Sequence, residues 1–312
     1  MVWQKQIWQV LQFGIMSRDN KMDQLKLLVS EMSETMFHIY IDWYSTFNRP
    51  LTECENMAIN IYKMMVWKAK TILMLSNGIG ILPTQKEIIA NPSNMYPVLR
   101  SMYEMLFLFR CIYSSSRDDD ERELLLKIWK MRGNNNLKQI PKDELDDELR
   151  NKKENAKHEN KTLLRDIHNL ENKLSLSPSI IGAIELCINN STPALKGFKF
   201  EHCDNCNAII DFREMNFSDK EFNRVLAGAS YRYTQFSAHS HPSFIGVKSF
   251  EDTYYKKEEI RATNTILEQT IRFLLLFLNE FCLYKDDYRQ VFEEKRHRMA
   301  EIMNQLDDPV VK

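Results

Sequence analysis

The sequence predicts an all-α protein, built as a bundle of long helices. Only eight glycines and nine prolines occur among 312 residues, so tight turns are few. Leucine, methionine, lysine, glutamate and glutamine are plentiful, and all five are good helix formers. Apolar residues recur every three or four positions along most of the chain, which is the spacing of one helix face.

The first quarter of the chain contains three expected helices. Residues 3–47 are expected to form two of them, separated near 17–20. A third is expected to begin after Thr52, a plausible N-cap, and to end at Asn77-Gly78. The helix before Pro50 has a regular apolar face, made of Leu25, Leu28, Val29, Met32, Met36, Ile39, Tyr40 and Trp43.

The next helix is expected to begin near Pro97, since proline suits the first turn, and its sequence is apolar nearly all round. Shorter helices are expected over 119–131 and 178–190, with an irregular stretch at 191–217 that has room for a short strand or two. A capping-box pattern at 218–221 predicts a helix that runs to about residue 241. Residues 242–254 are expected to be loop. Long helices follow to about residue 305, with an apolar face made of Ile266, Ile271, Leu274, Leu275, Leu278 and Phe281.

Residues 140–175 differ in composition from the rest of the chain. Seventeen of these 36 positions are Asp, Glu, Lys or Arg, and the apolar residues form only a thin stripe. We therefore expect a charged helical arm or hairpin inserted into one helical core domain formed by 1–139 and 176–312. Acidic residues are as common as basic ones in the segment, nine against eight, which favours a solvated arm over an RNA-binding one.

Composition and missing motifs restrict the function. The chain carries 42 Lys and Arg against 43 Asp and Glu, so there is no overall attraction to nucleic acid or to an anionic membrane. The longest apolar run, at 273–278, is too short to span a bilayer, and the N-terminus lacks a signal-peptide pattern. We expect a cytoplasmic protein with reduced thiols and no membrane partner. The sequence has no Walker A loop, G-x-G-x-x-G or H-E-x-x-H, so no nucleotide or other cofactor is expected.

Two of the seven histidines, His239 and His241, lie in one short stretch, YRYTQFSAHSHPSF at 231–244. Tyr233, Ser237 and His241 are spaced by four residues and share one helix face. Arg232 and His239 are seven apart and share another. Proline at 242 predicts that the helix ends near His241.

The segments RSMYE at 100–104 and YTQFSAHSHP at 233–242 resemble a bacterial all-helical family of uncharacterised function. That family has an R-x-x-x-E helix followed, after a variable insert, by Y-x-x-x-S-x-x-x-H. The resemblance covers about 50–110 and 215–285. It implies that Arg100, Glu104, Tyr233, Ser237 and His241 form a polar cluster.

The same stretch also resembles the HEPN superfamily of helical ribonucleases and toxins, which carry R-x(4–6)-H near a helix end. Arg232 and His239 fit the upper limit of that spacing. The resemblance implies metal-independent RNA cleavage, of the kind used in phage defence, with these two as catalytic residues and a homodimer as the active form. The chemistry is consistent, since histidine exchanges protons near neutral pH and arginine binds phosphate with a planar fork.

The alternative is a non-catalytic helical interaction or regulatory protein, in which Arg100 and Glu104 form a buried structural network with Tyr233, Ser237 or His241. A network of that kind is tolerated only when its hydrogen bonds are satisfied. We expect His241 to face the 97–113 helix, and His239 to point away from it, towards the side of Arg232.

A second candidate site is EHCDNC at 201–206, where His202 adjoins a Cys-x-x-Cys pair, Cys203 and Cys206. A structural zinc site needs four ligands, usually from two such pairs, and no second pair exists. We expect an ordinary loop with two thiols and no metal, with His202, Cys203 and Cys206 as the weak metal candidates.

Overall fold

The computed structural model describes residues 18–46, 49–78, 90–137, 140, 146–189, 197–206, 208–216, 222, 229–240, 243–255 and 258–284. At a few helical positions, including Arg232, it describes the backbone alone. The chain forms two compact units. The first comprises residues 1–106 and 223–312, and the second comprises 107–222.

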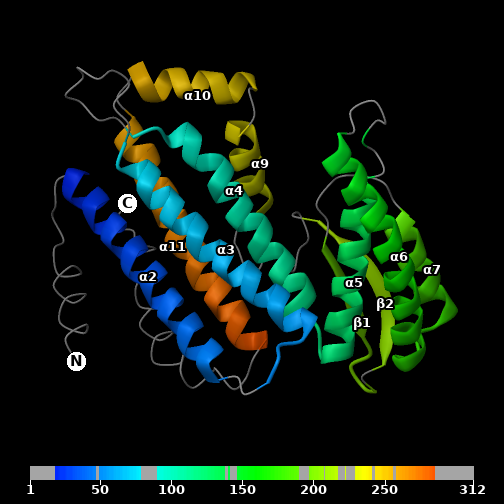
Figure 1. The fold of residues 1–312 in the computed structure, drawn as a ribbon. Coiled ribbons are helices and arrows are strands. Elements are labelled where there is room, and N and C mark those ends of the chain that lie inside the picture. The colour runs from blue at the N-terminus through cyan, green and yellow to red at the C-terminus, as the bar shows by residue number, and fades with distance from the viewer. Residues whose placement is uncertain are drawn as a thin grey trace. The chain divides into compact units, whose positions relative to one another are not determined.

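The first unit is a helical bundle (Figure 1). It contains α2 (Arg18–Thr46), α3 (Glu53–Ser76), α4 (Pro92–Phe109) as far as residue 106, α9 (Ala229–Ser240), α10 (Phe244–Tyr255) and α11 (Glu259–Tyr284). Helices α2, α3 and α11 pack side by side. The expected α2 face is buried from Leu25 to Ile39, whereas Tyr40 is only partly buried and the Trp43 side chain is outside the described part. All six predicted core positions on α11 are buried.

Helix α3 begins and ends where its sequence predicts. Thr52 and Glu55 form a complete capping box, and Asn77 is the C-cap. Gly78 follows with φ 81°, a left-handed conformation that glycine adopts without steric cost. The Arg49 guanidinium also donates to both Glu55 carboxylate oxygens, at 2.8 and 2.7 Å, which fixes the approach of the chain to the helix.

Two predicted boundaries in this unit are wrong. Helix α4 begins at Pro92 rather than near Pro97, because Asn91 accepts the Ser93 N–H and Pro92 takes the first helical position. The segment expected to be loop at 242–254 is largely helical, as α10. Its cap is Ser243, whose hydroxyl accepts the Gly246 N–H at 3.0 Å.

The second unit places three helices and a short π-helical turn around a hairpin. Its elements are η1 (Arg110–Ser114), α5 (Asp119–Asn136), α6 (Asp147–Lys173), α7 (Pro178–Asn189), β1 (Gly197–His202) and β2 (Ile209–Met215). The two strands are antiparallel, with Phe200 opposite Phe212. A side chain at Gly197 would collide with the Cys111 sulfur, so only glycine lets β1 approach η1 this closely.

The charged segment 140–175 contains α6, which packs against α5 within this unit. Its thin apolar stripe is buried at Ala156, Leu163, Ile167 and Leu170, and most of the remaining surface is exposed. The division into one core domain and an inserted arm at 140–175 stays a prediction.

The all-α fold class is confirmed, since helices account for nearly all regular structure in the described residues and the strands there make one small hairpin. Among these helices none combines the length and apolar character that crossing a bilayer requires.

Candidate functional site

The polar residues of α4 and α9 meet in one cluster inside the first unit. The Arg100 Nε donates to Glu104 Oε1 at 2.9 Å, one turn along α4. The other arm of the guanidinium reaches α9, where Nη2 donates to the Tyr233 hydroxyl at 2.9 Å and Nη1 lies 3.5 Å from the Ser237 hydroxyl. The Tyr233 hydroxyl lies 3.4 Å from Glu104 Oε1. We call Arg100, Glu104, Tyr233 and Ser237 the arginine cluster.

An aromatic layer supports the arginine cluster. The Tyr103 ring, fully buried on α4, lies 5.8 Å from the Tyr233 ring and 5.8 Å from Phe273 on α11. Phe236, one turn after Tyr233, contacts the same Phe273 edge to face at 6.0 Å. Apolar packing therefore sets the separation of α4, α9 and α11, and the polar groups sit on a fixed frame.

The cluster is partly open to solvent, and its members shift one another's pKa values. The Arg100 and Glu104 side chains are 23% and 24% exposed. Burial lowers the pKa of Arg100, but the Glu104 carboxylate and the Tyr233 hydroxyl more than offset it, so the pKa is raised overall. Burial raises the pKa of Tyr233, against the pull of the Arg100 charge. Arg100 therefore stays charged and Tyr233 stays a neutral phenol, able both to accept from Arg100 and to donate to Glu104.

His239 does not point away from α4, and that prediction is wrong. Its imidazole stacks face to face on the Tyr96 ring of α4, with centroids 4.3 Å apart and planes 15° from parallel. Burial in this stack lowers the pKa of His239, so the imidazole is neutral at physiological pH. His241 lies outside the described residues. Arg232 belongs to α9, but its side chain is also outside them.

Tyr96 is the member of this site that sequence reasoning missed. Tyr96, Arg100 and Glu104 succeed one another at intervals of four, so they share one face of α4. That face meets α9, with Tyr96 against His239 and Arg100 against Tyr233 and Ser237. The spacing from Arg100 was a usable signal, but a tyrosine in an apolar helix is by default a core residue. The stack and the arginine cluster therefore lie one turn apart along the face of α4 that meets α9.

The Cys-x-x-Cys pair of the second unit lies in the turn that joins β1 to β2. The Cys203 N–H closes this turn by donating to the Ala208 carbonyl at 2.9 Å. Next to it, His202 Nε2 lies 2.7 Å from Glu121 Oε1 on α5, with both side chains almost fully buried. His202 is thus engaged inside the unit and is directed to a carboxylate.

The two thiols of the turn interact with each other. Hydrogen bonds from the Asn205 backbone, the Cys206 thiol and the Cys206 backbone, together with the charge of Arg117, lower the pKa of Cys203. No group of three or more metal-binding side chains that could hold an ion occurs in the described ranges. The turn therefore presents two free thiols.

Comparison of this chain with protein-family models, with curated proteins and with solved structures gives no significant match.

Proposed function

We propose that this chain is a HEPN-like, metal-independent ribonuclease or toxin, a cytoplasmic defence nuclease that acts on RNA as a homodimer. The observation that carries the proposal is a neutral imidazole, His239, stacked on Tyr96, which lies one turn before Arg100 of the partly exposed arginine cluster on the same face of α4. Proton transfer from a ribose 2′-hydroxyl requires a base that is unprotonated at the operating pH. The stack on Tyr96 supplies that condition.

In the proposed reaction, His239 accepts the 2′-hydroxyl proton while the 2′-oxygen attacks the neighbouring phosphorus. The bond from phosphorus to the 5′-oxygen breaks, that oxygen takes a proton from water, and His239 returns the proton that it accepted to the solvent. Arg232 binds the phosphate and stabilises its growing negative charge. The products are a 2′,3′-cyclic phosphate and a 5′-hydroxyl, and no metal or other cofactor takes part.

Substituting His239 with phenylalanine tests this proposal. Phenylalanine keeps an aromatic ring on Tyr96 but cannot exchange a proton, so we expect RNA cleavage to fall by about 100-fold or more while the far-ultraviolet circular dichroism stays unchanged. His38, an exposed histidine on α2, provides the matched control, and His38→Phe should retain full activity. Arg232→Ala should also lose activity. If parental protein cleaves no RNA, or His239→Phe cleaves as the parent does, the proposal is wrong.

A second candidate is a non-catalytic interaction or regulatory protein, and the contacts of Arg100 favour it. One guanidinium contacts Glu104, Tyr233 and Ser237, which is how a structural ion pair satisfies its hydrogen bonds. Here the arginine cluster fixes α9 on α4 and performs no chemistry. This candidate predicts that purified chain has no RNA cleavage, and that cluster substitutions change only the melting temperature.

A further inference from the structure

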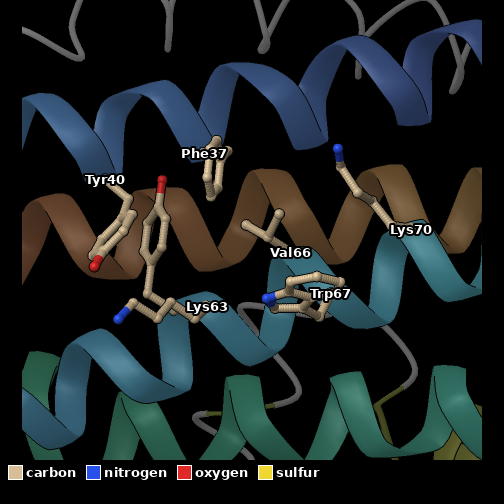
Figure 2. A pocket seen from close by; sticks show the side chains of 7 residues that line it. Phe37, Tyr40, Lys63, Val66, Trp67 and Lys70 are labelled. Atoms are coloured by element: carbon tan, nitrogen blue, oxygen red, sulfur yellow. The ribbon is translucent and has the colours of Figure 1, made fainter.

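An apolar groove of about 150 Å³ lies between α2 and α3, away from the arginine cluster in sequence and in chemistry. Figure 2 shows Phe37 and Tyr40 of α2 on one side of it, and Val66 and Trp67 of α3 on the other. Tyr62 also lines it. The Trp67 side chain is 68% exposed, and Phe37 is also exposed. Large aromatic side chains exposed together around a groove are typical of a surface that binds another apolar segment.

The rim of the groove is basic. Lys63 and Lys70 lie one turn before and one turn after Trp67 on the same side of α3. The Lys63 ammonium lies 4.6 Å from the centroid of the Tyr40 ring. No ion pair joins either lysine to a carboxylate within the described ranges. An amphipathic helix with an apolar stripe and acidic flanks therefore matches this groove in both shape and charge.

We propose that the occupant is residues 299–308 of this same chain, MAEIMNQLDD. Met299, Ile302, Met303 and Leu306 follow the i, i+3, i+4, i+7 spacing of helix-in-groove ligands. Glu301 and the Asp307-Asp308 pair add the negative charge that complements the lysine rim. The segment 1–16 is also apolar, but it carries one lysine and no carboxylate, so its charge does not suit Lys63 and Lys70.

The course of the chain permits this docking. Phe281, in the last turn of α11, packs on the groove residue Tyr62 with ring centroids 4.9 Å apart. Helix α11 ends at Tyr284, so residues 285–298 connect it to the proposed occupant. Fourteen residues span up to about 46 Å when extended, whereas the groove from Tyr62 to Lys70 is only about 12 Å of helix. The tether therefore reaches the groove with length to spare and holds the segment at a high local concentration.

Oxidative footprinting of the full-length chain tests the proposal, with Trp67 oxidation followed by mass spectrometry. Leu306→Asp places a charge in the apolar stripe and should raise the Trp67 oxidation rate by about threefold or more, because the docked population is lost. Asn304→Asp adds the same charge on the opposite face of the segment and should leave the rate at the parental value. Phe244, highly exposed on α10, serves as the internal reference for radical dose.

Two further measurements make the result decisive. Lys63→Glu with Lys70→Glu should also raise Trp67 oxidation, since it reverses the charge of the rim. Protection of Trp67 in the parent should not change on about tenfold dilution, as an intramolecular contact requires. Protection that falls on dilution would identify a second copy as the occupant and overturn the proposal. Equal Trp67 oxidation in the parent and in Leu306→Asp, with both proteins folded by circular dichroism, would also overturn it.

Discussion

The Arg100 guanidinium uses its planar shape to join two helices. Its Nε donates a hydrogen bond to Glu104 on its own helix, and its two terminal nitrogens donate to hydroxyl groups on α9. A lysine has one ammonium on a flexible stem and cannot hold three acceptors in these directions. The cluster therefore depends on arginine in particular, and the Tyr233 hydroxyl is its central acceptor.

Removing the Tyr233 hydroxyl should weaken the first unit. Tyr233→Phe keeps the ring contacts with Tyr103 but deletes the acceptor for Arg100 and the contact with Glu104. We expect a loss of about 1–2 kcal/mol in the free energy of unfolding, because a charged donor loses a partner in a partly buried site. Urea denaturation measures this loss.

The matched control is Tyr44→Phe on α2. The Tyr44 side chain is largely exposed, so its hydroxyl is already solvated in the folded chain and its loss should cost little. A Tyr233→Phe variant as stable as Tyr44→Phe would show that the arginine cluster does not stabilise the fold.

Sequence spacing placed the members of this cluster on helix faces, and the resemblance to the all-helical family implied that they form one cluster. R-x-x-x-E and Y-x-x-x-S each place two polar groups on one helix face, and the structure brings Arg100, Glu104, Tyr233 and Ser237 together. The side of α9 that carries His239 was misjudged. Helix periodicity gives the relative angle of two side chains on one helix, but it does not say which of several faces the neighbouring helix covers. Phe236 decides this, since its buried ring turns His239 towards Tyr96.

At the scale of elements, the helices that carry an apolar stripe were predictable from the sequence. A helix whose start depends on one capping residue was not. The apolar residues of α10 do not recur with a clear helical period, and a proline precedes the helix. Its sequence therefore suggests a loop. Ser243 changes the outcome, because its hydroxyl accepts the Gly246 N–H and donates to the Ala238 carbonyl at 2.7 Å, holding the turn from α9. The β1–β2 hairpin was anticipated only as irregular chain with room for strands. Its partner strand, rather than a sequence pattern, stabilises each strand.

Ser243→Ala should loosen the start of α10. Loss of an N-cap costs about 1 kcal/mol, so the amide of Gly246 should exchange with solvent about five times faster, as read by hydrogen–deuterium exchange. Ser240→Ala is the control, since the Ser240 hydroxyl donates to the Phe236 carbonyl of its own helix. Equal exchange at Gly246 in the two variants would mean that the Ser243 cap does not determine the helix start.

At the scale of the whole molecule, the two units are built differently. The first buries helix faces that are distant in sequence, with α2 and α11 in contact at opposite ends of the described chain. The second is formed by one continuous segment, 107–222, whose hairpin packs on η1 and α5. Sequence periodicity identifies the helices of both units, but it contains no information on which helices associate. The boundary near 107 falls inside an uninterrupted apolar helix, where composition gives no signal.

The global stability of the chain should depend on pH through His239. Burial against Tyr96 lowers the pKa of this imidazole below its ordinary value of 6.5. Between the two values the unfolded chain binds more protons than the folded one, so the free energy of unfolding decreases as the pH falls through that interval. The contribution of the neutral His239 to the free energy of unfolding is fully present above pH 6.5. It is lost as the pH falls from there through the lowered pKa of the folded chain.

His239→Phe keeps a ring on Tyr96 and removes the titrating group. Its melting temperature should therefore decline less steeply than that of the parent between about pH 7.5 and about pH 5.5. Calorimetry across this range measures both slopes, and His38→Phe, at an exposed position on α2, is the matched control. Parallel slopes in the parent and in His239→Phe would mean that the stacked imidazole is protonated as readily in the folded chain as in the unfolded one.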